Sequence, residues 1–378
     1  MAGNPPLPIW YQKEDVNDIY TQIRAGEFMS LVGIGSTGKS NLVNLIPRDD
    51  VKNYYLQDEA PYTVIVVINP HLLIQLGEAG LAHTGAAWAG YEIMLSRLRR
   101  RLIAAEHYSR LQQLGREKTL EDITGYYLNM FDQQASLAQA GIRHLENAVY
   151  DVLALGDNWR IAFIFDEFEQ FILTLPPAFF QSLRGLRDEY KGRISYITTS
   201  RKPLLELVED QYPDEDDRLT FEGFIELFFG NLHYVRPLDR DSARESVRRL
   251  EQRYNNTIRL DNGVRNLLIN VTGGHAGLLR RGFRPAAKLR DTMPDLDGQM
   301  LRVLLDNRGI SDECATLINS LPREERIVLR QHLHNQPIQD TEAWQSLIQK
   351  HIVYEVDGER RWRIPLLSGW CRKNEDQL

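Results

Sequence analysis

The sequence predicts an α/β fold in three parts: a parallel β-sheet with surrounding helices, a helical region, and terminal helices that end in a β-hairpin. As far as Pro237, apolar strand-length runs alternate with helical stretches, a pattern typical of βαβ units and of a parallel sheet. Beyond Pro237 the strand pattern stops and apolar residues recur at helical spacing. Near the C-terminus, VYEVDGERRWRI predicts two short strands around an Asp-Gly turn. We therefore expect the three parts at residues 1–238, 239–310 and 311–378.

The first part contains five predicted strands separated by helices. The run TVIVVINP is continuously apolar and β-branched, as expected of a strand that is covered on both faces. The expected strands are residues 28–32, 63–70, 159–165, 194–201 and 231–236. The expected helices are residues 12–25, a helix from Lys39 to Pro47, a mostly helical stretch over roughly 78–155, and residues 177–190.

The second and third parts are predicted from helical periodicity and from the hairpin. In the second part we expect helices over residues 239–255, 261–272 and 275–290, the last two separated by a Gly-Gly pair. The third part has helices followed by the hairpin, which is the order of elements in a winged-helix unit.

Composition excludes several classes of protein. The net charge of −7 gives the chain no general attraction to nucleic acid or to an anionic membrane. The only cysteines, Cys314 and Cys371, are far apart, which excludes a disulfide framework and a zinc site and fits a reducing cytoplasm. The N-terminus lacks the pattern of a signal peptide, and the apolar runs are too short to span a bilayer. We expect a cytoplasmic protein without a membrane partner.

A glycine-rich motif links the first strand to the next helix. Residues 33–40, GIGSTGKS, match GxxxxGK[ST] after a strand and at the start of a helix, the context that this phosphate-binding loop requires. Backbone N–H groups and the helix N-terminus would cradle phosphates, Lys39 would reach the β- and γ-phosphates, and the Ser40 hydroxyl would bind Mg²⁺. The expected nucleotide-binding residues are Gly33, Gly35, Ser36, Thr37, Gly38, Lys39, Ser40 and Asn41.

Two acids follow another apolar strand directly. Asp166 is expected to hold Mg²⁺ together with Ser40, and Glu167 is expected to polarise the attacking water as general base. Glu169 is close enough in the sequence to be confused with the base. The strand-acid pair is a weak signal alone and a strong one beside the phosphate loop, so the sequence predicts a parallel-sheet P-loop NTPase core with ATP and Mg²⁺ as cofactors.

The stretch ISYITTSR supplies a third element. Its strand is expected between the phosphate-loop strand and the acidic strand, with its end towards the γ-phosphate. With the loop and the acid pair, TTSR resembles the sensor of the STAND branch of AAA+-like NTPases, including NB-ARC members, in which an arginine reads the γ-phosphate. The resemblance covers residues 8–370 and implies a catalytic role for Arg201, which is otherwise a helix-capping surface arginine.

The resemblance also extends to the second part and the N-terminus. VTGGHAGLL is similar to the GGxP-like segment of this branch, where a turn and its proline pack near adenine, although this chain has Ala276 at the proline position. By this resemblance His275 would approach the phosphates, unless it is simply a structural histidine. The N-terminal stretch IWYQKE is loosely similar to the hhGRE-type segment of this branch. That similarity implies that Trp10 or Tyr11 stacks on the base.

These features predict an ATP-hydrolysing switch that couples nucleotide state to conformation, self-association or binding of a separately encoded protein partner. The absence of an NKxD tetrapeptide favours ATP over GTP. DNA is possible but not favoured, because residues 311–378 contain nine Lys/Arg and eleven Asp/Glu, a net charge of −2. The alternative functions are a nucleotide-stabilised scaffold with little turnover and a DNA-acting AAA+ ATPase of the origin-recognition or transposition type.

Overall fold

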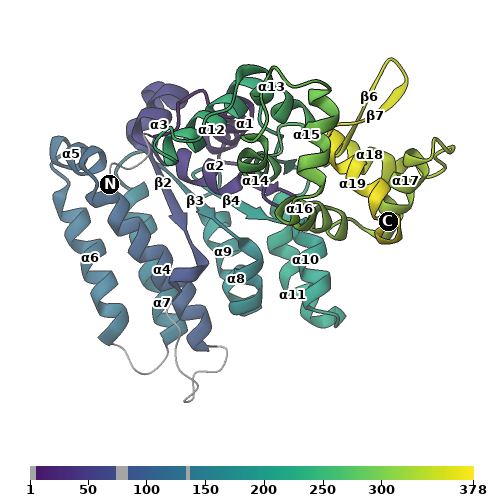
Figure 1. Ribbon diagram of the computed structural model, residues 1–378. Helices are drawn as coiled ribbons and strands as arrows, with labels where there is room; N and C mark the ends of the chain where they lie inside the picture. The colour runs from purple at the N-terminus through teal and green to yellow at the C-terminus, as the bar shows by residue number, and fades with distance from the viewer. Residues whose placement is uncertain (1–5, 74–83, 133–136) are drawn as a thin grey trace. The chain divides into compact units, whose positions relative to one another are not determined.

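The computed structural model describes residues 6–73, 84–132 and 137–378 (Figure 1). The chain divides into two compact units. The sheet unit consists of Glu14–Val32 and Ser40–His233, and the helical unit consists of Met1–Lys13, Gly33–Lys39 and Tyr234–Leu378. Within the predicted helical stretch over residues 78–155, residues 78–83 and 133–136 lie outside the described residues.

The sheet unit is built on a five-stranded sheet with the order β2-β3-β4-β1-β5. The pairs β2–β3, β3–β4 and β1–β4 are parallel, and β4 lies between β1 and β3 as the sequence predicts. Almost every residue of β1 to β4 is buried, which explains why these strands are continuous apolar runs rather than alternating ones. The strands are β1 (Met29–Val32), β2 (Thr63–Ile68), β3 (Arg160–Phe165), β4 (Ile194–Ser200) and β5 (Leu232–Tyr234).

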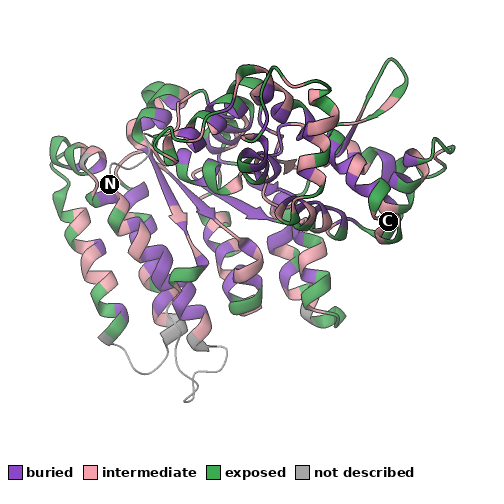
Figure 2. Cartoon of the chain, viewed as in Figure 1, coloured by how far each residue is buried: buried purple, intermediate pink, exposed green. Residues whose placement is uncertain are grey.

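Helices surround this sheet and supply the other half of its core. Helices α4, α6 and α7 contact one another, and α4 also contacts β2 (Figure 1). Their buried faces, with an aromatic cluster around Phe165, Phe168 and Phe180, form one continuous apolar core (Figure 2). The helices are α1 (Lys13–Ala25), α2 (Lys39–Leu45), α3 (Asp49–Leu56), α4 (Thr84–Ile103), α5 (Ala105–Gln113), α6 (Glu117–Asp132), α7 (Leu137–Leu153), α8 (Phe168–Thr174), α9 (Pro177–Glu189), α10 (Leu204–Gln211) and α11 (Glu215–Ile225). Short 3₁₀ turns occupy Gln57–Tyr62, Pro70–Leu72 and Glu226–Phe228.

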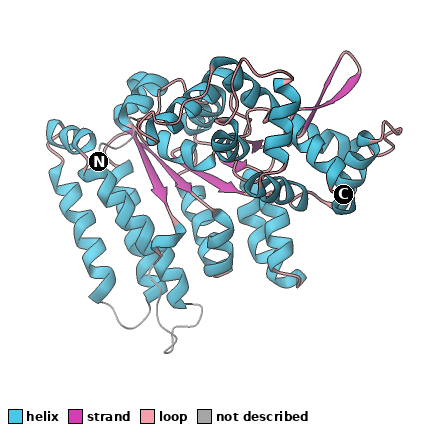
Figure 3. Cartoon of the chain, viewed as in Figure 1, coloured by secondary structure: helices cyan, strands magenta, loops and turns pink. Residues whose placement is uncertain are grey.

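The helical unit contains helices and a single two-stranded antiparallel sheet among its described residues (Figure 3). Side-chain caps from Asp239, Asn307 and Asp340 accept N–H bonds at three helix starts, which fixes where those helices begin. The helices are α12 (Arg240–Arg253), α13 (Asn262–Val271), α14 (Ala276–Ala286), α15 (Leu296–Leu305), α16 (Arg308–Asn319), α17 (Arg323–Leu333), α18 (Thr341–Gln349) and α19 (Pro365–Lys373). The hairpin is β6 (Val353–Val356) with β7 (Glu359–Trp362), and a 3₁₀ turn, Glu375–Gln377, follows α19.

The predicted fold class is therefore confirmed: a parallel-sheet α/β core, then helices, then terminal helices with a β-hairpin. Several short helices were not anticipated, among them α3 and α15, because neither has a periodic apolar pattern long enough to stand out from its flanks. No helix in the described part of the chain is both long and apolar enough to cross a membrane.

Candidate functional site

Strand ends bring polar side chains together at one edge of the sheet. Because β1, β3 and β4 are parallel neighbours, their carboxyl ends share an edge, with Phe165 opposite Thr198 and Val32 opposite Ser200. Asp166 follows β3, and its Oδ1 accepts hydrogen bonds from Thr199 Oγ1 at 2.7 Å and from the Glu167 N–H at 3.1 Å. Thr199 is fully buried, so it fixes the Asp166 carboxylate from inside the sheet.

Glu167 occupies an unusual backbone position. Its φ of 49° and ψ of 55° are left-handed, a conformation that costs energy for a non-glycine residue and is concentrated at functional sites. Its Oε2 lies 3.0 Å from Nε2 of His71, which follows β2. The Asn69 side chain accepts the His71 N–H at 2.9 Å and so caps the turn that carries the imidazole. His71 was not predicted from the sequence, since only the pairing of β2 with β3 brings it to Glu167.

The two other predicted groups at this edge form their own pair. Arg201 Nε lies 3.7 Å from Glu169 Oε1, and the arginine side chain is 72% exposed while that of Glu169 is 19% exposed. Glu169 is therefore turned towards Arg201 and the interior, whereas Glu167 is 46% exposed and reachable by a water molecule. This difference separates the two acids that sequence position alone left adjacent.

The predicted phosphate loop follows Val32 without a break and leads into α2. Gly35 and Gly38 have positive φ values of 62° and 105°, which side-chain-bearing residues adopt only with strain, so the motif's glycines are needed for this path. Lys39 Nζ donates to the Gly33 carbonyl at 2.6 Å. The Ser36 N–H donates to Oε1 of Glu313 at 3.2 Å, so a loop amide already binds an anionic group of the same chain.

Glu313 comes from α16 and has a second partner. Its Oε2 accepts from Arg281 Nε at 2.8 Å, and its side chain is 4% exposed. Burial alone would raise the pKa of Glu313, but the hydrogen bonds from Arg281 and Ser36 hold that pKa below its usual value. The side chain is therefore ionised at neutral pH. No local signal in the sequence marked it, because Glu313 is 277 residues away from Ser36.

His275 begins α14 beside the loop. Its Nδ1 accepts the Leu278 N–H at 3.3 Å, which leaves the proton on Nε2, and Nε2 lies 3.4 Å from the Ile34 carbonyl. Burial lowers the pKa of His275, in keeping with a neutral ring. The imidazole thus supports the loop backbone, which is the arrangement expected of the structural alternative for this residue.

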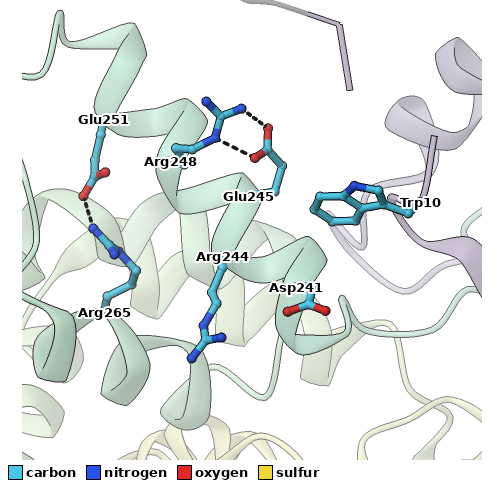
Figure 4. A pocket seen from close by; sticks show the side chains of 7 residues that line it. All are labelled: Trp10, Asp241, Arg244, Glu245, Arg248, Glu251 and Arg265. Atoms are coloured by element: carbon cyan, nitrogen blue, oxygen red, sulfur yellow. Dashed lines mark hydrogen bonds and ion pairs between the residues drawn. The ribbon is translucent and has the colours of Figure 1, made fainter. Parts of the chain in front are cut away.

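The two aromatic residues proposed for base stacking differ in environment. Tyr11 is fully buried, with its hydroxyl 2.9 Å from Ser246 Oγ in α12. Trp10 is 46% exposed and lines a groove of about 490 Å³ along α12 and α13 (Figure 4). The groove also contains the ion pairs Arg248–Glu245, at 2.6 Å, and Arg265–Glu251, at 3.0 Å. Of the two, only Trp10 offers an aromatic face to a ligand.

The residues present fit a nucleotide and Mg²⁺. A loop amide that holds a carboxylate can hold a phosphate oxygen, and Mg²⁺ in phosphate sites needs only one or two carboxylates from the protein. Asp166, at the end of β3, supplies one carboxylate of this kind. Nowhere in residues 6–73, 84–132 and 137–378 do three or more histidine, cysteine, aspartate or glutamate side chains form a metal-binding cluster.

Comparisons with known proteins give remote structural likenesses. No family model matches the sequence, and no curated protein matches it. A Walker-type ATPase of Pyrococcus abyssi is 14% identical with a TM-score of 0.46, covering 96% of this chain and 95% of that chain. Cdc6p from Pyrobaculum aerophilum is 12% identical, with a TM-score of 0.40 and coverage of 100% and 97%. The Aeropyrum pernix Orc1 protein in complex with DNA is 13% identical, with a TM-score of 0.39 and coverage of 99% and 85%. Likenesses this remote do not decide the function, which rests on the residues themselves.

Proposed function

We propose that the chain is a cytoplasmic ATPase that binds Mg·ATP and hydrolyses it slowly. The bound nucleotide would switch its conformation, its self-association or its binding to a protein partner. The observation that carries the proposal is the order β3-β4-β1. It puts Asp166, Thr199 and the chain exit from β1 at one sheet edge, and the phosphate loop starts at the next residue, Gly33. This is the topology expected if loop and acids act on one nucleotide.

Each residue then has a defined task. The loop amides and Lys39 bind the β- and γ-phosphates, and Ser40 with Asp166 would hold Mg²⁺, which supplies neutralising charge at the phosphates when bound. Glu167 polarises the water that attacks the γ-phosphate in line. His71 contacts the Glu167 carboxylate at 3.0 Å and would help to orient it.

The finer classification is part of the proposal. We place the chain in the STAND branch, with a core over residues 1–238, a helical lid over 239–310 and a winged-helix unit over 311–378. Arg201 would read the γ-phosphate. Its exposure and its loose 3.7 Å contact with Glu169 support this role, because such a side chain can turn to a ligand without losing a buried bond.

The two alternative functions, a scaffold and a DNA-acting ATPase, would require different properties of the same residues. A scaffold with little turnover would not need Glu167 or its strained backbone. A DNA-acting ATPase needs free cations on its terminal unit, but Lys350 is buried in a 2.5 Å ion pair with Glu325 and Arg361 is paired with Glu359 at 2.5 Å. Arg360 lies over the Trp344 ring. These contacts favour a packing or switching role for the unit.

The first test is nucleotide binding. Lys39→Ala should abolish ATP binding in titration calorimetry, because the phosphates lose their cation, whereas Lys191→Ala at an exposed position after α9 should bind as wild type does. Unchanged ATP affinity of the Lys39 variant would exclude the phosphate-loop assignment.

The second test is turnover. Glu167→Gln should keep ATP binding and reduce phosphate release by roughly a hundredfold or more, the usual contribution of a positioned base. Glu169→Gln tests the other acid and should reduce phosphate release much less than Glu167→Gln, because the Glu169 side chain is only 19% exposed. If the Glu169 variant loses activity and the Glu167 variant does not, the base has been assigned to the wrong acid.

A further inference from the structure

The phosphate loop binds a carboxylate that belongs to the same chain. Glu313 Oε1 accepts the Ser36 N–H at 3.2 Å, and Glu313 Oε2 accepts from Arg281 at 2.8 Å. The amides of such a loop are the groups that cradle phosphate oxygens in P-loop proteins. A buried anion therefore occupies part of the surface that a nucleotide would use.

Helices α14 and α16 lie directly against the loop. A Cβ atom at Gly277 in α14 would come within 2.4 Å of Glu313 Oε1 and 2.7 Å of Ser36 Cβ, so only glycine fits there. A Cβ atom at Gly35 would lie 3.1 Å from Leu317 Cδ2, one helical turn beyond Glu313. These distances show that α14 and α16 contact the loop closely around the Glu313 carboxylate.

The polar groups of Lys39 and Thr37 also face the protein. Lys39 donates to the Gly33 carbonyl. The Thr37 hydroxyl is buried and has no hydrogen-bond partner among the described residues. Phosphate binding would have to redirect Lys39 outward, away from its own backbone.

We propose that Glu313 is a built-in competitor for the phosphate loop, so that a nucleotide binds only by expelling Glu313, which releases α16 from the loop. The inference rests on the proposed function and adds its regulation. Two anions on the same amide repel each other, so a bound phosphate displaces the Glu313 carboxylate, and α16, which carries Glu313, moves with it. Nucleotide binding thereby moves α16.

The first experiment compares ADP affinity by calorimetry in wild type and Glu313→Gln. Removing the competing charge should tighten ADP binding by about tenfold or more, about 1.4 kcal/mol. Asp312→Asn is the control on the same helix: the Asp312 side chain is 64% exposed and lies 4.0 Å from Arg308, so its loss should leave ADP affinity within about twofold of wild type. The double variant Arg281→Gln/Glu313→Gln should keep the gain, since the gain comes from the lost carboxylate and not from a freed arginine.

The second experiment needs no variant and stays informative if Glu313→Gln folds poorly. Hydrogen exchange of wild type should show faster exchange of α16 amides (Arg308–Asn319) on addition of ADP, with α17 unchanged. Equal ADP affinity of wild type and Glu313→Gln, loss of the gain in the double variant, or slower α16 exchange with ADP would each overturn the inference while leaving ADP binding intact. If neither wild type nor Glu313→Gln binds ADP, both the inference and the proposed function fail.

Discussion

His107 in α5 makes the stability of the sheet unit depend on pH. The imidazole is fully buried, and its Nε2 lies 3.5 Å from Nζ of Lys52, which is itself buried and paired with Glu106 at 3.1 Å. Burial, together with the positive charges of Lys52 and Arg101, lowers the pKa of His107 to about 3. In the unfolded chain the same side chain titrates near the ordinary value of about 6.5.

The sign and size of the effect follow from this difference in pKa. Below pH about 6.5 the His107 side chain binds a proton in the unfolded state but stays neutral in the folded state. The free energy of unfolding therefore falls as the pH falls towards about 3. Between pH 7.5 and 5.5 this residue should cost about 1.4 kcal/mol of stability. That figure depends on the unfolded pKa alone, provided that the folded value lies well below 5.5.

Urea unfolding followed by circular dichroism at the two pH values tests the prediction. His107→Gln, which cannot titrate, should lose about 1.4 kcal/mol less than wild type between pH 7.5 and 5.5. If wild type and His107→Gln lose equal stability, His107 is not held neutral by burial.

Two further predictions concern ligands. Arg201→Ala should weaken ATP binding by about 1.5–3 kcal/mol, the range of a hydrogen bond to a charged group, and leave ADP binding almost unchanged; equal losses for both nucleotides would make Arg201 structural and leave the switch without a trigger. Duplex DNA should bind weakly at physiological salt, and Arg361→Ala should not alter that, since Arg361 is engaged by Glu359; a sub-micromolar complex that is lost in this variant would contradict the reading of the terminal unit. Lys350→Ala would be a poor probe, because it breaks a buried ion pair and should destabilise the fold.

The sequence by itself determined most of the local elements. Apolar strand runs, helical periodicity and the Asp-Gly turn each depend on neighbours within a few residues, so the parallel sheet, the helices and the hairpin were predictable. The glycine-rich loop and the acid pair could be located for the same reason, since each is a short segment with a strand immediately before it.

Only the tertiary structure decided which distant side chains contact these segments. Thr199 bonds to Asp166 across 33 residues, His71 contacts Glu167 across 96, and Glu313 reaches Ser36 across 277. Such partners follow from strand order and from the packing of one helix on another, which no window of neighbouring residues encodes. The same holds for the surroundings of Glu167 and Glu169. The two acids are close in the sequence, but the fold directs one carboxylate to His71 and the other to Arg201.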